Sequence, residues 1–146
     1  MIGELLDSQL TGVLATDAAG RPYASLVAFS YTEDLEKLIF ATPKESRKYA
    51  DMMGNPEVAL LIDDRGNEVA DFQRAVAVTV LGRVRESEGE ERETLLHLYS
   101  KRHPSLENFA ISPSTALMVV EVERYRMVLR FQQVEELCID GSSGEP

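Results

Sequence analysis

A chain of 146 residues with 44% hydrophobic and 27% charged residues is typical of one globular domain that buries a full core. Its formal net charge of -10 excludes the basic surface that binds nucleic acid or an anionic membrane, so neither partner is predicted. One cysteine, Cys138, excludes an internal disulfide, and no apolar run reaches the roughly 18 residues of a membrane span. Because the N-terminus is too acidic for a secretory signal, we expect a cytoplasmic protein.

The first quarter of the chain predicts a short helix followed by a strand and a hairpin. Apolar residues at helical spacing predict an amphipathic helix over residues 2–10. Alternation and turn residues then predict strands over residues 12–16, 21–31 and 37–42. A short polar turn separates the last two strands, which are therefore expected to pair as a hairpin. Tyr23, Ser25, Val27, Phe29 and Tyr31 fall on one face of the middle strand.

The next segment, ATPKESRK at residues 41–48, predicts the start of a helix. Thr42, Pro43 and Glu45 match the cap, first and third helical positions of a capping box. The helix is expected to continue to about Met53, because Gly-Asn-Pro follows directly.

Three cations, Lys44, Arg47 and Lys48, lie in the first turn of this predicted helix. Basic residues are favoured in the last turn of a helix and disfavoured in the first, unless an anion binds there. The unpaired N–H groups of the first turn and the Ser46 hydroxyl would add hydrogen-bond donors for a phosphate. The pattern thus predicts a phosphate site, with a solvated charged helix face as the alternative.

The rest of the chain predicts more strands, one further helix and a tail. Strands are expected over residues 57–63, 75–85, 115–124 and 127–135, and a helix over 89–103. Gly82 predicts a bulge or a close backbone approach. The fold class is therefore mainly β (α+β): a six- to seven-stranded antiparallel closed or split β-barrel with peripheral helices. Residues 1–139 are expected to form one domain, and residues 140–146 a disordered tail.

The two histidines, His97 and His103, both fall on the helix predicted over residues 89–103. Two histidines without clustered acidic residues do not make a metal site, so no metal is predicted. His103 is expected to cap carbonyl groups at the C-terminus of its helix. A role as a haem ligand is the alternative for either residue.

Two stretches, GRPYASLVAFSY and LIFATPKESRKYADMMGNPEVALLI, carry a resemblance to a known family. Their G-x-P-x-x-S strand, the threonine after the hairpin return, the S-R-K triplet and the N-P-x-V-x-L-L strand resemble the pyridoxamine 5'-phosphate oxidase-like family of FMN-binding split barrels. The later stretches VLGRVRE, KRHP and VEVERYRMVLRF resemble an uncharacterised branch of that family, which is also similar to the barrel of haem-utilisation proteins.

The resemblance implies FMN as the cofactor and assigns residues to its parts. The phosphate would be held by Ser46, Arg47 and Lys48, and the ribityl chain and ring would lie beside Ala41 and Thr42. The ring would be lined, largely by backbone groups, by Ser25, Leu26, Val27 and Ala28. The family also implies a homodimer that shares the flavin between its subunits.

This chain departs from the oxidases themselves at three places. Ser25 stands where they carry an arginine, and Ala77 where they carry a flavin-contacting glutamine, for which Gln73 or Arg74 could substitute. Their C-terminal arginine and histidine motif is not recognisable here. Oxidation of vitamin B6 is therefore not predicted, no catalytic residue is assigned, and the small-molecule substrate is unknown.

Three functions remain open from the sequence. The first is an FMN-dependent oxidoreductase, in which the flavin supplies the redox chemistry. The second is a module that binds flavin for storage or sensing without turnover. The third is a haem-binding or haem-degrading relative. A deazaflavin could take the place of FMN at the same phosphate site.

Overall fold

The structure is a computed structural model that describes residues 1–130 and 132–139. The predicted disordered tail, residues 140–146, lies outside the described residues. The strands are β1 (Thr11–Ala18), β2 (Arg21–Tyr31), β3 (Lys37–Pro43), β4 (Glu57–Asp63), β5 (Val76–Glu86), β6 (Thr115–Leu129) and β7 (Gln133–Cys138). The helices are α1 (Ile2–Ser8), α2 (Arg47–Gly54), α3 (Asp71–Arg74), α4 (Gly89–Arg102) and α5 (Glu107–Ile111), with a 3-10 turn, η1, at Pro104–Leu106.

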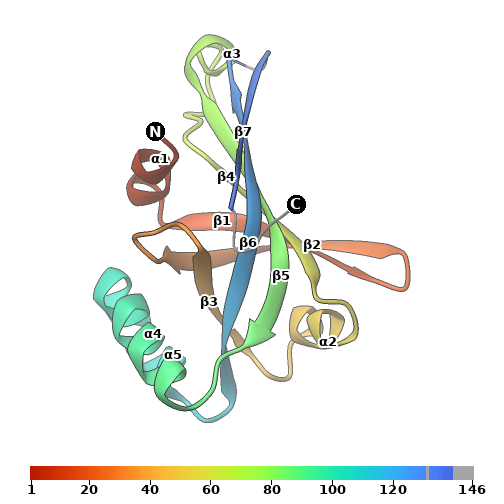
Figure 1. Cartoon of the computed structure of the whole chain (residues 1–146), viewed down its shortest axis with the longest axis vertical. Helices are drawn as coiled ribbons and strands as arrows, with labels where there is room; N and C mark the ends of the chain where they lie inside the picture. Colours follow the sequence, from red (N-terminus) through yellow and green to blue (C-terminus); the bar gives the residue numbers. More distant parts are fainter. Residues whose placement is uncertain (131, 140–146) are drawn as a thin grey trace.

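The strands form one antiparallel sheet in the order β3-β2-β1-β4-β5-β6-β7. An additional β3–β6 pairing closes the first six strands into a barrel, and β7 pairs with β6 outside it. In Figure 1, β1 and β2 run across the molecule, while β5 and β6 follow its long axis. The predicted mainly β, antiparallel barrel with peripheral helices is confirmed.

Two hydrophobic clusters hold the barrel together. The larger cluster contains inward-facing side chains such as Leu14, Phe29 and Phe40, together with Leu6 of α1 and Met52 of α2. The smaller cluster joins Ile39 of β3 and Leu117 of β6 to Leu95 and Tyr99 of α4 and to Ala110 of α5. Helices α4 and α5 therefore cover the outside of β3 and β6, on the side opposite α2 (Figure 1).

Gly82 allows the barrel to close where β5 meets β6. The register between these strands shifts between Leu81 and Gly82, as expected from the sequence. A Cβ atom at Gly82 would lie 3.0 Å from Val120 Cγ1 and still closer to the carbonyl oxygen of Glu121. Any larger side chain would therefore push the two strands apart.

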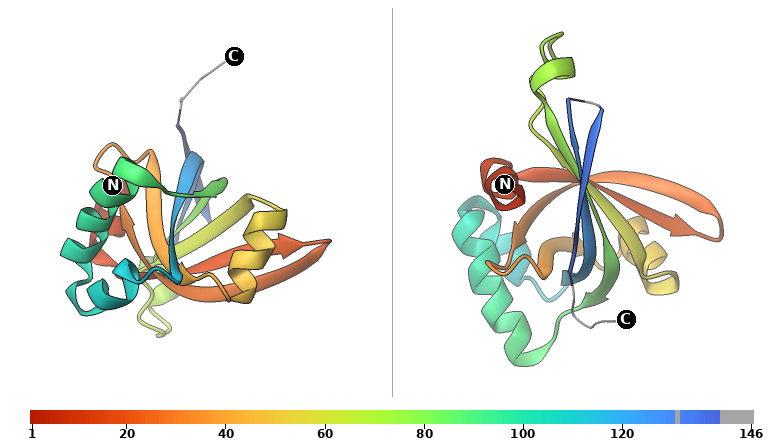
Figure 2. Two further views of the ribbon diagram at one scale, coloured as in Figure 1. Left: turned by 90° about the horizontal axis from the view of Figure 1, so that it is seen from below. Right: turned by 45° about the horizontal axis from the view of Figure 1, so that its top comes forward.

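The prediction of two strands over residues 115–124 and 127–135 is wrong. One strand, β6, continues through Thr115–Leu129, and a hairpin then leads to β7, which projects from the barrel beside α3 (Figure 2). The residue in the expected turn, Tyr125, is completely buried and donates a 2.7 Å hydrogen bond to the carbonyl of Leu35. Of the helices in residues 1–130 and 132–139, none is long and apolar enough to cross a membrane.

Candidate cofactor site

The barrel is split between β2 and β3. These strands pair only from Phe29 to Tyr31 on β2 and from Leu38 to Phe40 on β3. Before Phe29, β2 pairs with β1 alone, and after Phe40, β3 pairs with β6 alone. Both strands therefore present a backbone edge that no strand of residues 1–130 and 132–139 occupies. The residues that the resemblance assigns to the flavin, Ser25, Leu26, Val27, Ala28, Ala41 and Thr42, all lie along these two edges.

Alternation of the backbone determines which groups of β2 face the split. The Phe29 N–H donates to the Leu10 carbonyl on the β1 side, whereas the Ala28 carbonyl accepts a 3.3 Å hydrogen bond from the Tyr99 hydroxyl of α4. The N–H and carbonyl of successive residues point to opposite sides of a strand. Leu26, two residues before Ala28, therefore also directs its N–H and carbonyl into the split. These groups form an edge with both donors and acceptors.

The start of α2 differs from the predicted capping box. Thr42 and Pro43 still belong to β3, where they pair with Ala116 and Thr115 of β6. Ser46 is the cap instead, since its Oγ accepts a 3.2 Å hydrogen bond from the Tyr49 N–H. The expectation of a cap at Thr42 is therefore wrong, because strand pairing keeps this residue in the sheet. Thr42 Oγ1 still lies 2.8 Å from Ser46 Oγ, which joins the edge of β3 to the start of the helix.

Arg47 is directed from the first position of α2 toward β2. Its guanidinium carbon lies 4.7 Å from the centre of the Tyr23 ring, a cation–π distance. Its Nε lies 3.9 Å from Oδ2 of Asp51, a buried carboxylate that also accepts a 3.4 Å hydrogen bond from Thr16. The Arg47 side chain nevertheless remains 58% exposed, so its guanidinium is accessible to a ligand.

The two neighbouring lysines differ in their surroundings. Lys44 lies 3.6 Å from Glu86, which also accepts a 2.7 Å hydrogen bond from the Tyr49 hydroxyl. No ion pair involves Lys48 within residues 1–130 and 132–139, and the residue itself lies in the first turn of α2. Of the three predicted cations, Arg47 and Lys48 are thus the ones available to an anion.

Ser25 carries a buried hydroxyl whose hydrogen-bonding capacity is unused. Its Oγ is inaccessible to solvent and has no hydrogen-bond partner in the described part of the chain. It shares a face of β2 with Tyr23, over which Arg47 lies. Because an unpaired buried hydroxyl is unfavourable, this group fits a site that supplies an acceptor when a ligand binds.

The outer face beside the split is apolar and exposed. Cross-strand pairing places Leu26, Val13 and Leu61 in one row across β2, β1 and β4. Leu26 is 69% exposed and Leu61 is 38% exposed, which is unusual for a row of large apolar residues. Beyond Leu61, a small hollow of about 140 Å³ lies over Ala77, where the oxidases carry their glutamine. The proposed substitutes, Gln73 and Arg74, are both exposed on α3.

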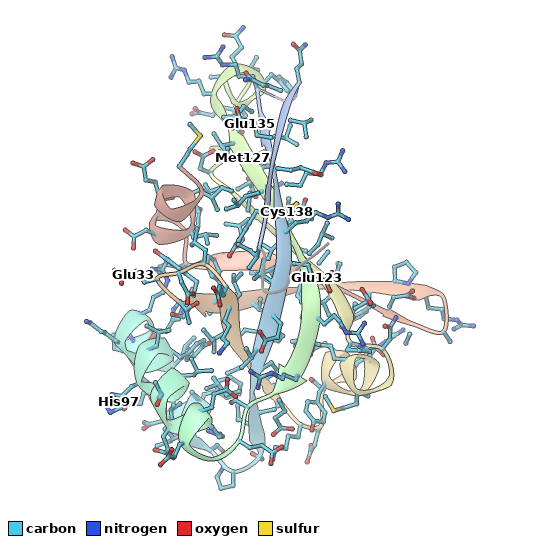
Figure 3. All side chains as sticks on the ribbon, viewed as in Figure 1. Glu33, His97, Glu123, Met127, Glu135 and Cys138 are labelled. Carbon is cyan, nitrogen blue, oxygen red and sulfur yellow. The ribbon has the colours of Figure 1, made fainter. Side chains whose placement is uncertain are left out.

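The two histidines have different environments. His103 is buried, and its Nε2 lies 2.6 Å from the carbonyl oxygen of Phe29, to which it donates. The prediction that His103 caps carbonyls of its own helix is therefore wrong. His97 points outward from α4 (Figure 3) and lines an open hollow of about 660 Å³ together with Glu33, Leu98 and Lys101.

The family of the chain follows from its sequence. The profile of the family described as "Pyridoxamine 5'-phosphate oxidase" matches residues 2–129. The chain belongs to this family. A comparison with curated proteins finds no match.

Solved structures support the same fold. A haem-binding protein from Mycobacterium smegmatis superposes with a TM-score of 0.82 at 18% identity, covering 92% of this chain, which spans 55% of that protein. A FAD-binding protein from Mesorhizobium loti gives a TM-score of 0.70 at 19% identity, covering 86% of this chain and 88% of that one. A putative pyridoxamine 5'-phosphate oxidase from Listeria innocua gives 0.67 at 21% identity, covering 87% and 94%. At these identities the likeness establishes the fold alone.

Proposed function

We propose that residues 1–139 form a domain that binds FMN in the split between β2 and β3. The observation that carries this proposal is the continuity of the unpaired strand edges with the start of α2, through the contact between Thr42 and Ser46. A flavin mononucleotide needs such a combination, because its ring has polar edges and its phosphate is doubly charged. When bound, the flavin supplies hydride and electron transfer, which the side chains of the protein cannot.

In this proposal the phosphate binds at the N-terminus of α2. Arg47 offers a planar pair of donors and Lys48 a point charge, while the first-turn N–H groups add the helix dipole. Ser46 and Ser25 contribute hydroxyl groups, and Ser25 lies where the oxidases place an arginine. The loss of one cation is consistent with weaker phosphate binding than an oxidase with that arginine would have.

The flavin ring lies along the strand edges. The N–H and carbonyl of Leu26 are available on β2, and the backbone of Ala28 faces the same way, whereas Val27 between them directs its backbone groups toward β1. Ala41 and Thr42 form the opposite edge on β3. Such backbone groups suit the alternating donors and acceptors of an isoalloxazine rim and would tune its reduction potential.

A second copy of the chain would cover the ring. The exposed row of Leu26, Val13 and Leu61 adjoins the residues assigned to the flavin. A contiguous apolar surface of this kind favours burial against another protein surface. We therefore propose a homodimer with the flavin at its interface, acting as an oxidoreductase on a small molecule.

The test is to add FMN to the purified protein, remove free ligand by desalting and record the absorbance spectrum. We expect flavin bands to remain with the protein. A protein that never retains FMN contradicts the proposal. Reduction of the bound flavin by NADH or NADPH, followed by reoxidation with a candidate substrate, distinguishes an enzyme from a module that binds flavin without turnover.

Haem binding is a second candidate, because His97 is exposed and lines the 660 Å³ hollow beside α4. One structural neighbour is described as a haem-binding protein. If haem binds there, the imidazole of His97 could serve as a ligand to its iron. Titration with haem, monitored by the Soret band, should then give a complex that His97→Ala loses. The buried His103, already bonded to Phe29, serves as the comparison residue.

A further inference from the structure

Tyr99 lies at the point where β2 and β3 separate. Its side chain extends from α4 and is only 1% exposed. The hydroxyl donates to the Ala28 carbonyl of β2 at 3.3 Å, and Ala41 of β3 packs in the same hydrophobic cluster as Tyr99, with its backbone directed so as to lower the pKa of the hydroxyl. Ala28 and Ala41 are the first residues beyond the last paired rung, Phe29 with Phe40. The hydroxyl therefore bridges the two strands where their own pairing ends.

The bridge is held firmly by α4. The ring of Tyr99 packs in the smaller hydrophobic cluster beside Leu95, and its centre lies 5.0 Å from that of His103. His103 in turn donates to the carbonyl of Phe29, the neighbour of Ala28. Two adjacent residues of β2 are thus fixed by Tyr99 of α4 and by His103, which directly follows α4, just where the free edge begins. Burial raises the pKa of the Tyr99 hydroxyl to about 12, so the group stays protonated and able to donate at neutral pH.

We propose that Tyr99 is a positioning residue that sets how far the split opens and which backbone groups remain available to the flavin ring. This inference rests on the proposed flavin function. Because Tyr99 occupies the Ala28 carbonyl beside Ala41, the N–H and carbonyl of Leu26 are the groups of this part of β2 that remain available to the ring. Tyr99 would then act on the ring alone, since its hydrogen bond, its ring contact and its packing cluster in the described part of the chain include none of residues 46–48, which are assigned to the phosphate.

Tyr125 provides a matched control for this inference. It is also a completely buried tyrosine whose hydroxyl donates to a backbone carbonyl, that of Leu35, at 2.7 Å. Leu35 lies in the turn that joins β2 to β3, at the end of the hairpin away from the split. The variants Tyr99→Phe and Tyr125→Phe each remove one buried hydroxyl and one hydrogen bond to a carbonyl, but only the first alters the split.

The experiment measures the affinities of the wild type and both variants for FMN and riboflavin, together with the spectrum of the bound flavin. Both variants should unfold at a lower denaturant concentration than the wild type. We expect Tyr99→Phe to weaken FMN and riboflavin alike, by about fivefold, the typical effect of one hydrogen bond, and to shift the spectrum of the bound flavin. Tyr125→Phe should leave both affinities and the spectrum unchanged.

A Tyr99→Phe variant with wild-type affinities and spectrum would overturn the inference, as would equal changes in both variants. A wild type that binds neither flavin would instead refute the proposed function. If Tyr99→Phe does not fold, hydrogen exchange of the wild type tests the inference instead. The Ala41 amide should already exchange slowly without FMN. Exchange of the Leu26 amide should slow only when FMN is added. Slowing of the Ala41 amide by FMN would contradict a bridge through Tyr99.

Discussion

The β5–β6 and β2–β3 pairs are both antiparallel, yet they differ greatly in extent. β5 pairs with β6 along its whole length, from Val76 to Glu86, whereas β2 and β3 share only the three rungs from Phe29 to Tyr31. The long pair includes the bulge at Gly82, and Arg85 of β5 forms ion pairs with Glu121 of β6 and with Glu91 of α4. The short pair ends in free backbone edges that continue to the cationic start of α2.

This difference indicates a division of roles between two sides of one barrel. The β5–β6 side satisfies its backbone groups internally and closes the fold. The β2–β3 side leaves backbone groups without a strand partner in the described residues, so a ligand or a second protein can pair with them. Changes on the first side should therefore affect unfolding, and changes on the second should affect ligand binding.

The largest expected effect on stability comes from Gly82→Ala. The added methyl group would collide with the Glu121 carbonyl, so the strands must separate at the bulge. We expect the free energy of unfolding to fall by about 3 kcal/mol, measured by urea denaturation. Gly54→Ala is the control, because nothing lies within 4 Å of a Cβ at this position. Equal effects of the two changes would contradict the importance of the bulge.

A smaller effect is expected from Glu91→Gln on the same side of the barrel. Hydrogen bonds from Arg85 lower the pKa of the Glu91 carboxyl from 4.5 to about 2, although burial opposes the shift. A carboxyl with a lowered pKa stabilises the fold above its ordinary pKa, and that contribution is lost as the pH falls toward the folded value.

The wild type should therefore be more stable than Glu91→Gln at about pH 7, by less than about 1 kcal/mol because the pair is partly exposed. The two proteins should converge as the pH falls from about 4.5 toward 2, which urea denaturation over this pH range would measure. A difference that stays constant down to the lowest pH would refute the assignment of the lowered pKa to Glu91.

The smallest effect on stability is expected from Ser25→Ala in the split. Since the Ser25 hydroxyl is buried without a partner, its removal should leave the free energy of unfolding within about 0.5 kcal/mol of the wild type or raise it. The affinity for FMN should still fall a few-fold if the hydroxyl contacts the ligand. A loss of stability well above that margin, without loss of FMN affinity, would make Ser25 a structural residue.

Much of the fold could be predicted because local patterns and tertiary contacts agree. The alternation of β2 places Phe29 in the core, and Gly82 lies at the bulge that it predicts. The break proposed after Arg124 was wrong because the charged residues of β6 face outward while Tyr125 remains buried. A turn and an exposed stretch of a long strand are both rich in charged residues, so composition alone does not distinguish them.

The candidate site could be predicted in part. The cations at the start of α2 stand out in an acidic sequence, but the capping box at Thr42 was misleading, since β6 holds this residue in the sheet. The role of Tyr99 had no local signal, because its partner Ala28 lies 71 residues away in the chain. The four-residue spacing of Leu95 and Tyr99 puts both on one side of α4 and says nothing about the group that the Tyr99 hydroxyl reaches.

The central claim is that the start of α2 binds the phosphate of a flavin held in the split. The most direct measurement compares FMN with riboflavin, which lacks the phosphate, in the wild type, in Arg47→Ala with Lys48→Ala, and in Lys44→Ala. We predict that the double variant loses about 100-fold in affinity for FMN and little for riboflavin. Lys44→Ala should bind FMN nearly as the wild type does, because Lys44 pairs with Glu86. Unchanged FMN binding by the double variant, or an equal loss for both flavins, would contradict the account.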